Sequence, residues 1–517
     1  MNFNDPDRAR DELERAMRSG SPQAIVRAAT ANIWPLYCFH HRMLVCAVEA
    51  LPSALLDRHP ALKVVHPMTP VLARGARPFK PLVYQDDARS MSPDELDLLT
   101  MVQMIAFRFS GDVAAALIYA RRLEERILKV PTESRSRVDG PLWFFHFQIG
   151  TTLLTAGDTT RALREFATAR QLAPLCGQPG ARRVALARTA LAHAVRGSRK
   201  EALRFLSEAE REPEPQPGAA HADAIRATEA AATALVQVET LPDADVLFDS
   251  LEGYDSIEVS WPFALLARVR FSLATQRPHD ALETLMLARD AHPTQHGSFA
   301  GDVVTSGLIE AYVAMGDLVE ARDAARRAGA PGILTRLAEA RLHLAEGRYG
   351  NAVHGLQLIL ADTHLGPGAR DEARALLAWA EYARDGHLDP LVASRLCRQA
   401  ADISARRMLA TVPRQLVAHV AEVSSPDAAQ RFTAVVSDLT HPEMTERPKL
   451  TAGELRVLNA LPRHETTAEI ASTFHVSPNT VKSQLASLYR KLGCASRDEA
   501  VRVAARLNLL SAASGPE

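Results

Sequence analysis

A glycine followed five residues later by an alanine recurs along this chain and sets narrow limits on its fold. Five such copies occur, and a sixth has glutamine in place of the glycine: Gly111–Ala116, Gly157–Ala162, Gly197–Ala202, Gln276–Ala281, Gly316–Ala321 and Gly347–Ala352. Glycine ends a helix readily, and a small alanine in the next helix lets the two helices cross closely. Because the six copies occur in order, with their alanines 46, 40, 79, 40 and 31 residues apart, they predict a stack of helical hairpins.

The clearest copy covers residues 150–174. We expect a first helix to end at Gly157 and a second helix to carry Ala162, Phe166 and Ala169 on one face, with Phe166 filling the gap between the helices. Pro174 then stops the second helix. This spacing resembles the tetratricopeptide (TPR) pattern, although the commonest interval here, 40 residues, is longer than the 34 usual for that repeat.

Segments outside the six copies complete the domain organisation. The interval of 79 residues leaves room for a degenerate copy near Ala244, after a helix over 221–238. Recurrent prolines indicate an irregular connector over 59–93, and Ser425 with Pro426 starts a last helix that ends at Val436. The polar segment 437–449 contains proline and indicates a linker. We therefore predict a TPR-like helical-repeat domain over 1–436, for sensing or interaction, and a separate small domain over 450–512.

The segment after this linker carries a local excess of positive charge. Residues 441–517 hold ten Lys and Arg against eight Asp and Glu, whereas the whole chain has a net charge of -1. Between Ile470 and Arg497 there is no acidic residue, but there are four basic ones. A basic patch on a nearly neutral protein is typical of nucleic-acid binding.

Four short helices are predicted in this segment from its capping residues. Thr451 and Glu454 form a capping box, and Gly493 ends the third helix in a left-handed conformation. Pro478 fits the first position of the third helix, where a missing N–H costs nothing. The expected N-caps of the four helices are Thr451, Thr467, Ser477 and Ser496.

The third of these helices has two different faces. Its apolar stripe consists of Val481, Leu485, Leu488 and Leu492. The opposite face is small, polar and cationic, and it consists of Asn479, Ser483, Ala486, Ser487 and Arg490, flanked by Lys482 and Gln484. Such a face suits a helix that enters the major groove of duplex DNA, because acidic side chains there would repel the phosphates.

The segment closely resembles the LuxR-type (GerE-like) helix-turn-helix domain of transcriptional regulators. The residues that carry the resemblance are Leu450-Thr451, Glu454, Val457-Leu458, Glu469-Ile470-Ala471, Val476-Ser477, Asn479-Thr480-Val481-Lys482, Tyr489-Arg490-Lys491-Leu492-Gly493, Ser496-Arg497, Glu499-Ala500-Val501 and Leu509-Leu510. The resemblance implies double-stranded DNA as partner, with Lys482, Ser483, Gln484 and Ala486 on the base-reading side. It implies phosphate contacts for Thr480, Arg490 and Lys491.

One departure from that family lies in the turn before the second helix. The family usually has a glycine there, whereas this chain has Pro462-Arg463-His464-Glu465-Thr466.

The resemblance also implies a homodimer on DNA, paired through the fourth helix over Arg497–Asn508, where we expect Ala500, Val501 and Ala504 to form the contact. RNA polymerase is a further expected partner.

The helical array resembles the sensor region of MalT-like large LuxR regulators, at Trp34-Pro35, at Leu51-Pro52 and in the repeats. Those regulators carry an NTPase domain before the array. This chain contains no Gly-Lys dipeptide and therefore no Walker A loop to hold nucleotide phosphates. The resemblance implies a MalT-like regulator that lacks its ATPase. We also expect neither a receiver domain nor an autoinducer-binding domain.

Other kinds of chemistry find little support in the sequence. We expect no catalytic site, cofactor or metal: Cys38, His40, His41 and Cys46 match no zinc spacing, and His464-Glu465 lacks the second histidine of a zinc protease. Five scattered cysteines indicate a reduced cytoplasmic protein, and the absence of long apolar stretches indicates no transmembrane helix. With the expected DNA binding, we expect the protein to be associated with the nucleoid. Ligand-binding residues stay unassigned, because Trp143, Phe144, Phe145 and Phe147 suit the repeat core better than a groove.

These observations predict an all-α transcription regulator whose repeats sense a small-molecule effector or dock a partner protein in their groove. The alternative is a helical-repeat interaction scaffold in which the DNA-binding module is secondary.

Overall fold

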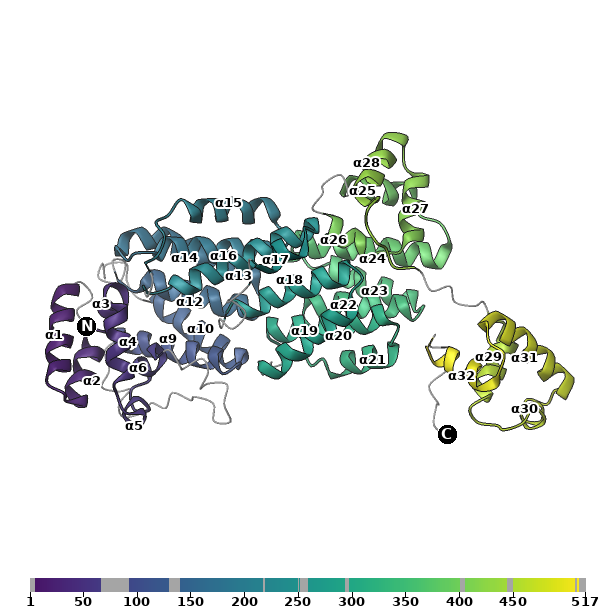
Figure 1. Ribbon diagram of the computed structural model, residues 1–517, viewed down its shortest axis with the longest axis horizontal. Helices are drawn as coiled ribbons and strands as arrows, with labels where there is room; N and C mark the ends of the chain where they lie inside the picture. The colour runs from purple at the N-terminus through teal and green to yellow at the C-terminus, as the bar shows by residue number, and fades with distance from the viewer. Residues whose placement is uncertain are drawn as a thin grey trace.

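The computed structural model describes residues 5–66, 93–129, 140–216, 219–249, 251, 259–292, 297–399, 405–443, 450–506 and 509–510. All regular secondary structure in these residues is helical (Figure 1), which confirms the prediction of an all-α chain. None of the described helices combines the length and the apolar content needed to span a membrane.

The chain begins with a block of short helices and continues as helical hairpins (Figure 1). The first block consists of α1 (Pro6–Arg18), α2 (Pro22–Ala31), α3 (Ile33–Phe39), α4 (His41–Glu49), α5 (Ser53–Leu56) and α6 (Pro60–Val65). The hairpins are α9 (Pro93–Phe109) with α10 (Val113–Lys129), α12 (Leu142–Thr155) with α13 (Thr159–Leu172), α14 (Ala181–Val195) with α15 (Arg199–Glu210), α16 (Ala222–Gln237) with α17 (Ala244–Asp249), α18 (Trp261–Ala274) with α19 (Pro278–Ala291), α20 (Phe299–Met315) with α21 (Leu318–Arg327), and α22 (Ile333–Ala345) with α23 (Tyr349–Leu360).

The array ends with α24 and a small block that has its own apolar core around Phe432. These helices are α24 (Pro367–Asp385), α25 (Pro390–Gln399), α26 (Arg406–Ala410), α27 (Arg414–Val423) and α28 (Pro426–Val436). The first helices of successive hairpins lie against one another in the order α14, α16, α18, α20, α22 and α24. This is the stacked arrangement that the repeated spacing predicts, whereas its assignment to the TPR class stays a prediction.

The turn inside each predicted hairpin has the same geometry in all six copies. Gly111, Gly157, Gly197, Gly316 and Gly347 have positive φ, and so does Gln276 in the sixth copy. In each copy the N–H of the following residue donates to the carbonyl five positions back, as Asp158 does to Leu153 at 2.9 Å. This pairing is the Schellman motif that ends an α-helix. The six alanines that follow are fully buried where the helices meet.

Phe166 fills the gap between α12 and α13, as the sequence predicts. Its side chain is fully buried, and a Cβ atom on Gly150 would lie 2.7 Å from its ring. Trp143 is also fully buried and Phe144, Phe145 and Phe147 nearly so, which places the aromatic cluster in the core.

The structure confirms some of the predicted segments outside the copies and corrects others. The degenerate copy is present as α16 and α17, and the last helix before the linker is α28, with Ser425 as N-cap. The connector over 59–93 is wrong in part, because α6 begins at Pro60, while residues 67–92 lie outside the described residues. Residues 437–443, expected to begin the linker, lie against the array: Pro442 accepts the Arg414 N–H at 3.0 Å.

A backbone contact joins two distant hairpins of the array. The N–H of Gly368, at the start of α24, donates to the carbonyl of Arg196, at the end of α14, at 2.9 Å. A Cβ atom on Gly197 would lie 2.6 Å from Cα of Gly368, and one on Gly366 would lie 2.7 Å from the Arg196 oxygen. We call this glycine-on-glycine approach the closure contact. It requires residues without side chains on both sides.

An ionic network connects five segments near the closure contact. Arg407 of α26 lies between Glu239 at 2.9 Å and Glu372 of α24 at 3.2 Å. Arg341 of α22 binds the other oxygen of Glu372 at 2.8 Å, and Arg270 of α18 lies 3.4 Å from Glu239. Glu372, Arg341 and Arg407 are buried, so each needs the opposite charge of its neighbours.

Candidate DNA interface

The C-terminal domain consists of α29 (Ala452–Ala460), α30 (Thr467–Thr473), α31 (Pro478–Leu492) and α32 (Arg497–Arg506) (Figure 1). Thr451 and Glu454 form the predicted capping box, and Ser477 caps α31 through the N–H of Thr480 at 3.1 Å. Gly493 ends α31 at a φ of 63°. The Oγ of Ser496 accepts the N–H of Glu499 at 3.2 Å at the start of α32.

The predicted N-cap of α30 is wrong by one residue. Thr466, not Thr467, accepts the N–H of Glu469, and the Glu469 carboxylate in turn accepts the N–H of Thr466. This second capping box spans Thr466 to Glu469, the same three-residue spacing as the first. The spacing to the glutamate was therefore the signal that could have identified the correct threonine.

The apolar stripe of α31 forms the centre of this domain. Val481, Leu485, Leu488 and Leu492 are buried against residues of α29, α30 and α32. Burial of this stripe fixes the rotation of α31 about its own axis. The opposite face of the helix is therefore exposed to solvent.

The predicted DNA-binding residues divide into two groups by exposure. The exposed group consists of Asn479, Thr480, Lys482, Ser483, Ala486 and Arg490. The half-buried group consists of Gln484, Ser487 and Lys491. Within the exposed group the side chains are small or cationic, so the surface carries positive charge without steric bulk. Their contacts with DNA stay a prediction.

The half-buried group lies toward the N-terminus of α29. Lys491 Nζ donates to Glu454 Oε2 at 2.7 Å. A Cβ atom on Gly453 would lie 2.5 Å from the Gln484 amide nitrogen, so Gln484 packs on this end of α29. Glu454 therefore offsets the charge of Lys491 at the edge of the surface.

The hydrogen bond from Lys491, with those from the Thr451 N–H and from Ser487, holds the pKa of Glu454 at about 2. Since this value is below that of an unfolded glutamate, about 4.3, the charged pair stabilises the domain at neutral pH. The stabilisation is lost as the pH falls from about 5 toward 2.

We expect Glu454→Gln to destabilise this domain by about 1–3 kcal/mol at pH 7, because it removes a charge-assisted bond in a buried place. Hydrogen exchange of peptides from residues 450–506 measures the effect as faster exchange. Glu469→Gln is the matched control, since Glu469 closes the second capping box without a lysine partner. Equal changes in both variants would contradict a special contribution from Lys491.

The side chain of Arg497 hydrogen-bonds to the turn before α30, where this chain departs from the family that it resembles. Its Nη1 donates to the carbonyl of Glu465 at 3.0 Å, and its Nη2 donates to the carbonyl of Leu461 at 2.6 Å. A long side chain from α32 thus satisfies carbonyls in the turn that lacks the usual glycine. In the sequence, Arg497 stands out as part of the basic patch and of the family resemblance, but its bonds to carbonyls 32 and 36 residues away leave no local signal.

The predicted dimer contact on α32 needs correction. Ala500 and Ala504 are fully buried in the core of the domain, so they are not available to a second copy. Val501 is half-buried, and Arg502 is exposed.

Comparison with known proteins agrees with this architecture. Residues 448–504 match the family model described as bacterial regulatory proteins, luxR family. The C-terminal domain is a LuxR-type helix-turn-helix domain. An 86-residue stretch of the chain is also 36% identical to the transcriptional regulatory protein YdfI of Bacillus subtilis (strain 168). This match covers 17% of the chain and 40% of that relative, so the chain spans less than half of the relative's length. The LuxR-type domain implies DNA binding, with α31 as its third helix.

Proposed function

We propose that this chain is a DNA-binding transcriptional regulator whose helix α31 enters the major groove of duplex DNA. The observation that carries the proposal is the exposed, small and cationic face of α31 within a LuxR-type domain. The chain acts by binding and not as an enzyme, and it needs no cofactor. As a DNA-binding regulator it works in the cytoplasm, at the nucleoid.

In this proposal the exposed residues of α31 have two different roles in DNA binding. Lys482, Ser483 and Ala486 face base edges, while Thr480 and Arg490 contact phosphates. Asn479 lies at the first turn of the helix, and the half-buried residues Gln484, Ser487 and Lys491 follow the edge toward α29.

We further propose that two copies bind related half-sites about one helical turn apart and that they act on RNA polymerase. Pairing would use the outer side of α32, around Val501 and Arg502, because its inner alanines are buried. The helical array senses a small molecule that controls this binding.

Lys482→Ala is expected to weaken binding to a preferred duplex by about 1–3 kcal/mol, and binding to random duplexes by much less, if Lys482 reads a base. Preferred sequences are first selected from a random duplex pool with the full chain. Fluorescence anisotropy across a salt series then measures the affinity of each variant for selected and random duplexes.

Arg456→Ala is the matched control, because Arg456 is exposed on α29 and its loss removes the same charge. An equal loss on all duplexes would make Lys482 a phosphate contact. Failure to select any preferred duplex, even at low salt, would contradict the regulator proposal and favour the interaction scaffold.

A further inference from the structure

A cavity of about 520 Å³ lies inside the helical array. One side is lined by the C-terminal ends of α12, α14 and α16, and the other side by the N-terminal ends of α20, α22 and α24. Gly197 and Gly368, which form the closure contact, are both on its wall. Its volume falls within the roughly 300–1,000 Å³ typical of small-molecule sites.

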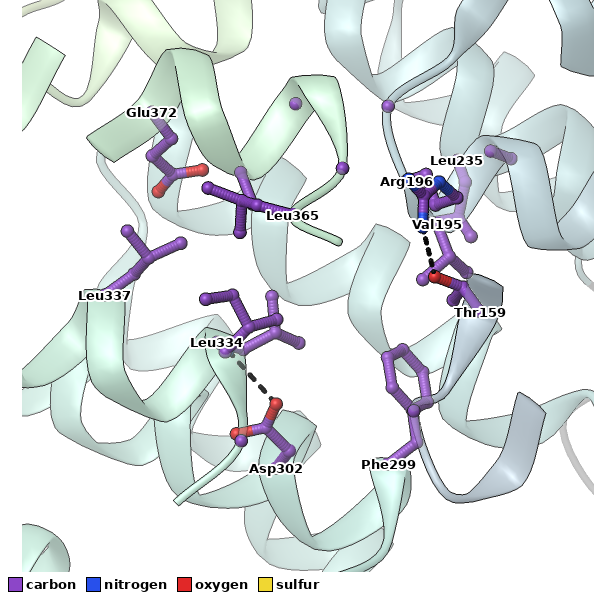
Figure 2. Close-up of a pocket in the computed structure, with 18 of the residues that line it drawn as sticks. Thr159, Val195, Arg196, Leu235, Phe299, Asp302, Leu334, Leu337, Leu365 and Glu372 are labelled. Atoms are coloured by element: carbon purple, nitrogen blue, oxygen red, sulfur yellow. Dashed lines mark hydrogen bonds between the residues drawn. The ribbon is translucent and has the colours of Figure 1, made fainter. Parts of the chain in front are cut away.

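The two sides of the cavity differ in chemistry (Figure 2). One side presents leucine side chains together with two carboxylates, and the facing side presents a guanidinium beside a hydroxyl and the aliphatic side chains of Val195 and Leu235. The residues that show this contrast are Leu334, Leu337 and Leu365 opposite Arg196 and Thr159, with Phe299 at the edge. A ligand that satisfies both sides must have an apolar part and a polar part.

Figure 2 labels two carboxylates on the leucine side. Glu372 is paired with Arg341 and Arg407. The oxygens of Asp302 are occupied as well. They accept the backbone N–H groups of Leu334 at 3.1 Å and of Thr335 at 2.9 Å. Asp302 thus caps the N-terminus of α22, where a negative charge is favourable. Its charge is offset there and does not make the cavity a site for cations.

Arg196 is positively charged and has only neutral hydrogen-bond partners. Its Nη1 donates to Thr159 Oγ1 at 3.0 Å and to Thr160 Oγ1 at 2.7 Å. In the described part of the chain, no carboxylate oxygen lies within 4.0 Å of this guanidinium. Burial lowers the pKa of Arg196, and Asp158 and Asp362 oppose this only from a longer distance.

Arg199 adds a second guanidinium to the same wall. Its Nε is buried and has no hydrogen-bond partner among the described residues. A buried donor without a partner costs roughly 1–3 kcal/mol, which an accepting ligand would relieve.

We propose that this cavity binds a small organic anion with an apolar body, whose anionic group sits on Arg196. The apolar body lies against Leu334, Leu365 and Phe299. Arg196 is partly withdrawn from water, and its hydroxyl partners leave its charge unbalanced, so an oxyanion is the ligand group that it favours. This inference deepens the proposed sensing role of the array and rests on that proposal for its regulatory meaning.

A pair of matched probes tests the proposal on the full chain without DNA. The anionic probe is 8-anilinonaphthalene-1-sulfonate, and the neutral probe is N-phenyl-1-naphthylamine, which has the same rings without the sulfonate. We expect Arg196→Gln to raise the Kd of the anionic probe roughly 10-fold or more and that of the neutral probe less than 2-fold. Arg196→Lys keeps the charge and should restore most of the affinity. Arg164→Gln, an exposed arginine on α13, is the control for charge alone.

A second set of measurements tests whether the leucine side of the cavity binds the apolar part of the ligand. Leu334→Gln should weaken both probes, and octanoate should displace the anionic probe at concentrations where inorganic phosphate does not. Circular dichroism and thermal unfolding check that each variant is folded.

Equal anionic-probe affinity in wild type and Arg196→Gln would overturn the proposal, and would assign the binding to a separate apolar cavity of about 210 Å³ between Trp34 and Phe147. Displacement by phosphate as readily as by octanoate would overturn the apolar part. Because no DNA is present, either failure leaves the DNA-binding proposal untested by this experiment, and a failure to bind DNA leaves the cavity assignment standing.

Discussion

Glu372→Ala is expected to lower the free energy of unfolding of the array by about 3–5 kcal/mol, because it removes the carboxylate that two buried arginines share. Glu372 receives Arg341 on one oxygen at 2.8 Å and Arg407 on the other at 3.2 Å. Both arginines are buried, so the loss of this carboxylate leaves part of their charge unbalanced away from bulk water. All four tryptophans lie before residue 380, so tryptophan fluorescence during urea unfolding reports on the array.

Asp371→Asn is the matched control for this variant. Asp371 is the neighbouring residue on α24 and pairs with Arg374 at 3.3 Å, where both side chains are partly exposed to solvent. Such a surface pair is worth about 0–1 kcal/mol. Similar losses for both variants would contradict the importance of the ionic network.

The stability of the array should depend on pH, because Glu372 and the arginines that it contacts are charged. Burial alone would raise the pKa of Glu372, but Arg407, Arg341 and Arg270 outweigh it and hold the pKa well below its usual range. A depressed pKa means that the stabilisation is complete above the unfolded value of about 4.3 and declines as the pH falls below it. The difference in stability between wild type and Glu372→Gln should therefore shrink when the pH is lowered from about 5 to about 3.

Gly197→Ala is expected to destabilise the array by about 2–5 kcal/mol. Gly197 has a φ of 75°, which costs a residue with a Cβ atom roughly 1–2 kcal/mol. The added Cβ would also lie 2.6 Å from Cα of Gly368, so the two backbones must separate and weaken the bond from Gly368 to Arg196. Overpacking of this kind adds about 1–3 kcal/mol.

Gly157→Ala is the control that separates the cost of the left-handed conformation from the cost of the close Cβ contact. Gly157 occupies the same turn position one repeat earlier, with a φ of 83°, and a Cβ atom there would meet nothing within 4 Å. It should show only the cost of the left-handed conformation. Equal losses in urea unfolding for the two variants would mean that the closure contact contributes no stability.

Local features of this protein could be predicted from the sequence. The six hairpin turns depend on residues within about six positions of one another, since a Schellman motif closes between a carbonyl and an N–H of the same helix end. The caps of α29, α31 and α32 and the buried stripe of α31 are equally local. The resemblance that identified the C-terminal domain rests on these short-range patterns, which explains why the family comparison agrees with it.

The tertiary structure alone decided which distant residues meet. The stack curves by a small rotation at each repeat, so the approach of Gly197 to Gly368 depends on all the hairpins between them. The pairing of Arg407 with Glu239, 168 residues apart, has the same origin, and so does the cavity beside Arg196. On α32 the pattern allowed Ala500 and Ala504 to face either the core or a second copy, and only packing against α29 and α31 placed them inside. Spacing along a chain specifies each turn, but positions in space follow from the sum of all turns.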